Sequence, residues 1–332
     1  MKYPLNRPAA LLAGSLVATA TTLATTLAPT QAAAQAYPTK PIRIIVSLSA
    51  GSATDIIPRV IFDHVGQSMG QNFIIENRVG AGGSIAANAV AKADPDGYTL
   101  LVHSNGHVIA PAVTAKLPYD VLTDFTNVTS LGIVPHVLVI AAEKKINSIK
   151  ELVATVKKTP GGLIYAAVVG TAPHLNAEHF RKAMQIEGRM VPFKGAPEAL
   201  TEVLAARVDV YFSPIAPALP FLEDKKMIPL AVTAAKRVSA LPNVPTAMEQ
   251  GYADSVFGLW IGLYGPAKMP QAITDKLYAE IAKAGAKPEV ADRLKKMGVE
   301  PNLIPPADFD VYVRKEVEVS AELAKVAGLS KQ

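Results

Sequence analysis

Short apolar runs alternate along the chain with stretches in which apolar residues recur every three or four positions. The first run, Ile42–Leu48, is typical of a buried strand, and the next stretch, Asp55–Met69, has the spacing of a helix that stops at Gly70. The alternation resumes after residue 140, where Ser148 and Glu151 form the S-x-x-E pattern of a capping box. Strands that alternate with helices predict a mostly parallel sheet covered by helices on both faces.

The other predicted elements continue this alternation into a second half of the chain. Further strands are predicted at Phe73–Glu76, Thr99–Val102, Leu163–Ala167, Val208–Phe212 and Ile228–Thr233. Helices are predicted at Ser84–Ala93, Ser148–Lys158, His174–Met184, Ala199–Ala206, Ala218–Lys225, Gln271–Ala284, Pro288–Met297 and Ala307–Ala327.

No low-complexity linker separates the two halves, so we expect the chain to cross between two lobes more than once. The apolar segments Val134–Ala141 and Val256–Tyr264 are the predicted crossings. The sequence therefore predicts a two-lobed α/β fold. One domain comprises residues 37–140 and 258–332, the other comprises residues 141–257, and a ligand cleft lies between them.

The N-terminus has the composition of a secretory signal peptide. Lys2 and Arg7 precede an uncharged stretch, residues 8–30, and Ala34 and Ala36 then form an A-x-A site. Gly and Thr dilute the stretch, which disfavours a permanent membrane anchor. We therefore expect cleavage after Ala36 and a periplasmic protein.

Composition narrows the function classes. The 332 residues are half hydrophobic, contain no cysteine and carry a formal net charge of +5 that is scattered along the chain. Disulfides and thiolate chemistry are excluded, and no run of Lys or Arg suggests nucleic-acid binding. The periplasm also lacks ATP and a nicotinamide pool, which disfavours nucleotide ligands.

Four loops that follow predicted strands are rich in small and hydroxyl-bearing residues. They are SLSAGSATD (Ser47–Asp55), HSNGH (His103–His107), AVVGTAPHL (Ala167–Leu175) and FSPIAP (Phe212–Pro217). In an open parallel sheet, ligands bind beyond the carboxyl ends of the strands. Small residues allow backbone N–H groups to approach a ligand, and helix N-termini attract anions.

Familiar catalytic and cofactor motifs are absent from these loops. There is no G-x-G-x-x-G, no G-x-x-x-x-G-K-[ST] and no G-x-S-x-G, so dinucleotide, P-loop and α/β-hydrolase sites are disfavoured. His103 and His107 are four residues apart and His174 and His179 five apart, but no third metal ligand stands out near either pair. We expect neither a metal nor a cofactor. An exported hydrolase that uses His103, His107 or His174 is the alternative.

Three further side chains have two interpretations each. Asp55 can cap the helix that it opens, or orient water at a ligand. His174 begins a helix, where it can bond a ligand acid or cap the helix. Lys194 could reach the cleft, although a solvated surface lysine is the ordinary interpretation.

Several longer segments resemble a known family. They are YPTKPIRIIV (Tyr37–Val46), AGSATD (Ala50–Asp55), IENRVGAGGSIAANAVAKADPDGYTLL (Ile75–Leu101), LPYDVLTDF (Leu117–Phe125), PFKGAPEAL (Pro192–Leu200), ALPNVPT (Ala240–Thr246) and GLYGPAKMP (Gly262–Pro270). Together they are similar to the extracytoplasmic solute receptors of tripartite tricarboxylate transporters, the Bug-type binding proteins. The run from ENR to PDGYTLL is the most specific of them.

The resemblance implies a Venus-flytrap receptor and not an enzyme. Two α/β lobes would close over one small carboxylate, either a di- or tricarboxylate or an aromatic carboxylate. Backbone N–H groups, hydroxyls and water would hold it, and the loaded receptor would present it to an inner-membrane permease. A ligand-sensing partner of a membrane signalling protein would share the same fold. The receptor is expected to act as a monomer. The positions implied to bind the ligand are Ser47, Leu48, Ser49, Ala50, Gly51, Ser52, Thr54, Asp55, Ser104, Asn105, His107, Val169, Gly170, Thr171, His174, Lys194, Ser213 and Pro214.

This chain departs from the family pattern in three of its loops. In the fourth loop it has Ser213 and Pro214, where relatives often have Asp or Asn. The family usually has Pro-Phe and two or three glycines in the first loop, where this chain has Ser47-Leu48 and Gly51 alone. Many relatives have a serine-rich third loop. At those positions this chain has Ala166, Ala167, Val168, Val169 and Ala172. The loss of polar groups predicts a flatter or more apolar carboxylate, such as an aromatic acid, because unpaired buried polar groups cost about 1–3 kcal/mol each.

Overall fold

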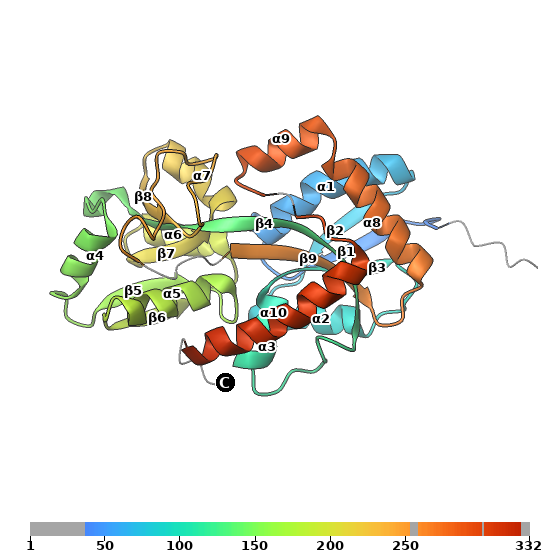
Figure 1. Ribbon diagram of the computed structural model, residues 1–332, viewed down its shortest axis with the longest axis horizontal. Coiled ribbons are helices and arrows are strands. Elements are labelled where there is room, and N and C mark those ends of the chain that lie inside the picture. Colours follow the sequence, from blue (N-terminus) through green and yellow to red (C-terminus); the bar gives the residue numbers. More distant parts are fainter. Residues whose placement is uncertain (1–36, 253–257, 301, 327–332) are drawn as a thin grey trace, which may run out of the picture. The chain divides into compact units, whose positions relative to one another are not determined.

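The computed structural model describes residues 37–252, 258–300 and 302–326 (Figure 1). The predicted signal peptide, residues 1–36, lies outside the described residues, as do the first two residues of the predicted crossing Val256–Tyr264. None of the helices in the described ranges is both long and apolar enough to cross a membrane.

The first part of the chain alternates strands and helices, as predicted. Its elements are β1 (Ile42–Val46), α1 (Ala53–Met69), β2 (Phe73–Asn77), the short η1 (Ala81–Gly83), α2 (Ser84–Ala91), β3 (Thr99–Ser104), α3 (Gly106–Val113) and β4 (Phe125–Ala141).

The second part repeats the alternation and then ends in helices. Its elements are η2 (Ala142–Lys144), α4 (Ile149–Val156), β5 (Leu163–Ala167), α5 (Ala172–Ala183), β6 (Gly188–Pro192), α6 (Ala196–Leu204), β7 (Val210–Pro214), α7 (Ile215–Glu223), β8 (Met227–Val232), β9 (Gly258–Pro266), α8 (Gln271–Gly285), α9 (Pro288–Lys296) and α10 (Pro306–Val326).

The described strands form one continuous sheet in the order β2-β1-β3-β9-β4-β7-β5-β6, with β8 paired to β4. β1 is parallel to β2 and β3, and β5 is parallel to β6 and β7, which confirms the two parallel units. Every antiparallel pairing involves β4 or β9. These two strands lie side by side and connect the units (Figure 1). We call β1–β3 with their helices and α8–α10 the first lobe, and β5–β8 with α4–α7 the second lobe.

Each lobe has its own hydrophobic core on both faces of its sheet. In the first lobe, α1 and α8 pack on one face around Ile44 and Val102, while Ile45 and Leu101 face the other side. In the second lobe, Leu138 and Val139 of β4 point to opposite faces and contribute to separate clusters. The buried runs on β1, β3 and β4 therefore reflect sheets that are covered on both faces.

Local signals located most helix starts correctly. Ser148 accepts a hydrogen bond from the N–H of Glu151 (3.1 Å), and the Glu151 carboxylate accepts one from the N–H of Asn147 (2.8 Å). The predicted capping box is thus confirmed, with the carboxylate reaching one residue further back. The pattern did not predict α3, β6 or the first half of β4. α3 starts at Gly106 and contains Pro111, both poor helix formers.

Candidate functional site

The loops that follow β1, β3, β5 and β7 converge on a small cavity between the lobes. Its volume is about 20 Å³. The first lobe contributes Leu48, Ser52, Ala53, Thr54 and Ser104; the second contributes Val168, Thr171, Pro173, Ala196, Tyr211 and Pro214; and β9 contributes Leu259. A cavity of roughly 10–15 Å³ holds one water molecule. An organic acid therefore enters only when the two sides move apart.

The N-terminus of α1 points its hydroxyl-bearing residues at this cavity. Ser52 is the N-cap residue but makes no side-chain capping bond. Ser52 is 2% exposed and Thr54 is fully buried, and neither hydroxyl oxygen has a hydrogen-bond partner. Buried hydroxyls normally find a partner, so two free ones at a helix N-terminus mark a place for a ligand acceptor.

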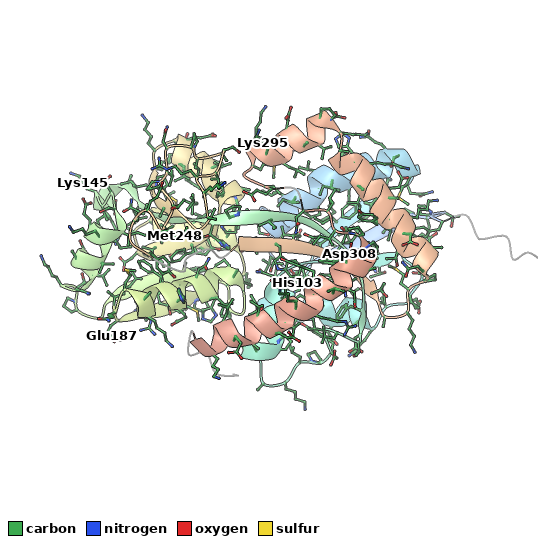
Figure 2. The ribbon with its side chains drawn as sticks, in the orientation of Figure 1. His103, Lys145, Glu187, Met248, Lys295 and Asp308 are labelled. Atoms are coloured by element: carbon green, nitrogen blue, oxygen red, sulfur yellow. The ribbon has the colours of Figure 1, made fainter. Side chains whose placement is uncertain are left out.

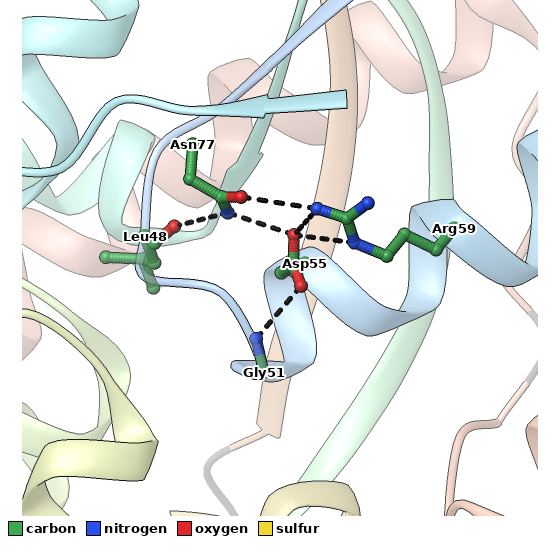
Figure 3. A network of polar contacts seen from close by, with 5 residues as sticks. All are labelled: Leu48, Gly51, Asp55, Arg59 and Asn77. Carbon is green, nitrogen blue, oxygen red and sulfur yellow. Dashed lines mark hydrogen bonds and ion pairs between the residues drawn. The ribbon is translucent and has the colours of Figure 1, made fainter. Parts of the chain in front are cut away.

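A network behind α1 fixes the loop that precedes it (Figure 3). Asp55 accepts hydrogen bonds from the N–H of Gly51 (2.9 Å), from the Arg59 guanidinium (2.8 and 3.0 Å) and from the Asn77 amide (2.9 Å). The same Asn77 amide donates to the carbonyl of Leu48 (2.9 Å). Gly51 has φ +79°, a left-handed conformation that glycine adopts without strain. The loop is therefore held at both ends by one buried carboxylate and one amide.

This network also sets the charge of Asp55. Burial by itself raises the pKa of the Asp55 carboxyl, but the hydrogen bonds from Arg59, Gly51 and Asn77 and the positive charge of Arg59 outweigh it, so the pKa lies below its usual 3.8. Asp55 is therefore ionised and its oxygens are occupied. Asp55 is the third residue of α1 and not its cap, because its carboxylate bonds the N–H of Gly51 in the preceding loop; it holds that loop while Ser52 and Thr54 face the cavity.

The second lobe presents a different surface to the same cavity. Thr171, the N-cap of α5, donates its hydroxyl to the carbonyl of Val168 (2.6 Å). Tyr211 of β7 is 1% exposed and forms one wall. Burial first, and the nearby charge of Glu198 second, raise the pKa of Tyr211, so its phenol remains neutral.

The two lobes touch at the rim of the cavity. The hydroxyl of Ser49 donates to the Glu198 carboxylate (3.0 Å), which joins the first loop to α6. A Cβ atom added at Gly195 would lie 1.9 Å from the Ser49 hydroxyl oxygen, and one added at Gly82 would lie 2.6 Å from the carbonyl oxygen of Val169. Glycines thus permit the close approach of the lobes at both places.

His103 on β3, labelled in Figure 2, and His107 on α3 belong to the first lobe, and their ring centroids lie 5.5 Å apart. Both are fully buried, and no ring nitrogen of either has a hydrogen-bond partner. Burial lowers the pKa of His103 to about 3, and burial followed by the proximity of His103 lowers that of His107 well below 6.5. No three His, Cys, Asp or Glu side chains in the described ranges are placed to share a metal ion.

Six of the predicted site residues line the cavity: Leu48, Ser52, Thr54, Ser104, Thr171 and Pro214. Val169, Gly170 and His174 line a neighbouring pocket of about 560 Å³ that also includes Gly82 and Ile85. The N–H of Gly170 donates to the Nδ1 atom of His174 (3.4 Å), so this histidine bonds the start of its own helix.

The other predicted residues surround the cavity without lining it. Gly51 and Asp55 belong to the network, and Ser49 bridges the lobes. Ala50 and Lys194 are exposed, whereas Ser47 is buried beneath the loop. Ser213 donates to the carbonyl of Pro214 (2.9 Å), and the Asn105 amide donates to the carbonyl of Gly258 (3.2 Å). His107 packs against the rings of Phe125 and Tyr264, each with a centroid distance of 4.6 Å.

Sequence reasoning missed several residues of this site. Pro173, Ala196, Tyr211 and Leu259 line the cavity, and Arg59 and Asn77 complete the network. Tyr211 falls at the end of a predicted strand, next to a loop already singled out. Its place beside the Phe212–Pro217 loop is the sequence signal that could have identified Tyr211 as a site residue.

Comparison with known proteins matches this architecture to one family. Residues 57–329 match the family model described as "Tripartite tricarboxylate transporter family receptor" (TctC). The structure of the periplasmic binding protein BugD is 31% identical, with a TM-score of 0.85 over 89% of this chain and 100% of that one.

Two further solved structures contain a named ligand. Rpa4515 from R. palustris, solved with adipate, is 30% identical, with a TM-score of 0.86 over 89% of this chain and 100% of that one. MatC from Rhodopseudomonas palustris, with bound malate, is 29% identical, with a TM-score of 0.82 over 86% of this chain and 99% of that one. Both likenesses extend over both lobes.

Proposed function

Because the chain belongs to the tripartite tricarboxylate transporter receptor family, we propose that it is an exported receptor that captures a small carboxylate between its two lobes. Members of the family are periplasmic binding proteins that serve transport, and they are not enzymes. The relatives solved with adipate and malate hold carboxylates, which supports a carboxylate for this chain as well.

The free hydroxyls of Ser52 and Thr54 carry this proposal. They sit at the N-terminus of α1, a helix of 17 residues, where backbone N–H groups and the helix dipole favour an anion. None of the described residues that line the cavity is Lys, Arg or His. A carboxylate bound there is thus held by neutral donors, which avoids the desolvation of a buried cation.

The family also guides our proposals for export, oligomeric state, membrane partner and domain boundaries. The N-terminal signal peptide directs export, the mature chain acts as a monomer, and the loaded receptor docks on a cognate inner-membrane permease. For the domains we retain the division that the sequence predicts, with boundaries at 140/141 and 257/258. Closure of the lobes over the ligand would create the surface that the permease recognises.

Titration calorimetry of the mature chain with benzoate, hexanoate, adipate and malate tests the proposal. We expect at least one of these acids to bind, and Ser52→Ala or Thr54→Val to weaken it at least about tenfold, since a hydrogen bond to a charged group contributes about 1.5–3 kcal/mol. Ser239→Ala, at an exposed serine, is the matched control and should bind like the wild type. If no carboxylate binds, or if both α1 variants bind normally, the proposal is wrong.

A further inference from the structure

The helices that face the cavity differ in the backbone donors at their first turns. α1 begins Ala53-Thr54-Asp55, and each of these residues has an N–H group. In the second lobe, α5 has Pro173 and α6 has Pro197 within the first two positions, and the N-cap of α7 is Pro214. Proline has no N–H group, so α5, α6 and α7 each lack one backbone donor at the end that faces the cavity.

The hydroxyl groups show the same difference between the lobes. Ser52 and Thr54 are buried and have no partner. Across the cavity, the hydroxyls of Thr171 and Ser213 both donate to carbonyl groups of their own loops, at 2.6 and 2.9 Å. Unsatisfied buried groups are the ones that a ligand can engage, so the polar contacts available to a ligand are concentrated on the first lobe.

A carboxylate of the protein already lies at the start of α6. Glu198 is in the first turn of that helix, where negative charge is favourable, and it accepts the hydrogen bond from Ser49. Its charge also reaches Tyr211, a wall of the cavity, because it contributes to the raised pKa of that phenol after burial. The first turn of α6 therefore already carries a negative charge of the protein, close to the cavity wall that Ala196 and Tyr211 form.

From these observations we infer that the ligand carries a single carboxylate on an apolar body, and that Glu198 excludes a second carboxylate. The inference rests on the proposed function. The carboxylate binds at the start of α1, and the body packs against Val168, Pro173, Tyr211 and Leu259 of the cavity wall. A second carboxylate at that wall would meet the charge of Glu198 with few donors to offset it. This ligand class differs from the dicarboxylates named for the solved relatives.

Matched pairs of acids with the same body test this inference. Calorimetry at neutral pH should show hexanoate bound at least tenfold tighter than adipate, or benzoate at least tenfold tighter than terephthalate. Glu198→Gln removes the charge but retains an acceptor for Ser49. We expect this variant to bind the dicarboxylate of the preferred pair about tenfold tighter than the wild type does, with monocarboxylate affinity changed less than about threefold. Glu187→Gln is the matched control, because that side chain is 95% exposed in the second lobe (Figure 2).

The outcomes separate the inference from the function on which it rests. Dicarboxylates that bind as tightly as their monocarboxylate partners would overturn the inference and leave the proposed function intact. If Glu198→Gln preferred the monocarboxylate over the dicarboxylate as strongly as the wild type does, the role of Glu198 would be overturned. The absence of binding by any of the four acids would overturn the proposed function itself. The wild-type comparison decides the ligand class even if the variant does not fold.

Discussion

The two sides of the cleft are built by different means. On the first lobe, a buried carboxylate, a guanidinium and an amide hold the loop before α1, and they leave two hydroxyls free to face the cavity. On the second lobe, prolines begin the helices, hydroxyls bond their own loops, and Tyr211 and Val168 line the wall. One side is ordered by polar contacts and the other by packing.

In the function proposed above, neutral donors of one lobe would hold the anion, since no described residue that lines the cavity is Lys, Arg or His. Rigid neutral donors on one lobe must be prepared in advance, because a loop that reorganised on binding would cost affinity. The opposite lobe needs only a complementary shape. Evolution can therefore change the apolar wall, and with it the ligand body, without disturbing the anion site.

The two sides also differ in how their buried histidines are bonded. This difference gives the largest predicted effect on the unfolding free energy. The ring nitrogens of His103 and His107 make no hydrogen bond to another side chain, whereas His136 of β4, on the second-lobe side, bonds the Asn176 amide (3.0 Å). The first two have folded-state pKa values depressed below 6.5, so their contribution to stability is complete above pH 6.5 and is lost as the pH falls toward 3. At pH 5 we expect His103 alone to lower the unfolding free energy by about 2 kcal/mol and His107 to lower it further.

Urea denaturation of the wild type and His107→Phe between pH 7.5 and 5 measures this cost. Phenylalanine suits the aromatic surroundings of His107, formed by Phe125 and Tyr264. The variant should lose about half as much stability as the wild type over this range. Parallel stability profiles for the two proteins would show that His107 does not titrate on unfolding.

The network around Asp55 predicts the next effect. Asp55→Ala should lower the unfolding free energy by about 2–3 kcal/mol, because the Gly51 N–H and the Asn77 amide lose a buried acceptor. Glu198→Ala, its exposed counterpart on the second lobe, should change stability by less than about 0.5 kcal/mol. Chemical denaturation at neutral pH checks both variants. If both variants lost the same unfolding free energy, the first lobe would not depend on polar contacts more than the second lobe does.

The contact between the lobes predicts the smallest effect, and it concerns binding more than folding. Gly195 has extended backbone angles (φ −175°), so Gly195→Ala causes no backbone strain, but its Cβ would collide with the Ser49 hydroxyl. We expect a melting temperature close to that of the wild type and a three- to tenfold weaker carboxylate affinity. The double variant Ser49→Ala/Gly195→Ala should recover part of that affinity. An unchanged affinity in Gly195→Ala would mean that closure does not bring these residues together.

Local signals in the sequence located much of this fold. The apolar runs, the capping box at Ser148 and the small-residue loops identified strands, helix starts and the four loops, because these depend on neighbouring residues. The position of β9 between β3 and β4 was not predictable, since strand pairing over more than a hundred residues leaves no local pattern. Arg59 and Asn77 were missed for the same reason: they meet Asp55 only after the chain has folded.

The sheet order also has a consequence for biosynthesis. β3 pairs with β1 on one edge and with β9 on the other, and β9 in turn pairs with β4. A nascent chain that ends before residue 258 has made the four loops that converge on the cavity but lacks β9, one of the two strands that connect the lobes. The hydrophobic cores of the first lobe also include residues of α8 and α10, which follow β9 in the chain. The sheet that surrounds the cavity, with its hydrophobic cores, is therefore complete only after nearly all of the chain has been synthesised.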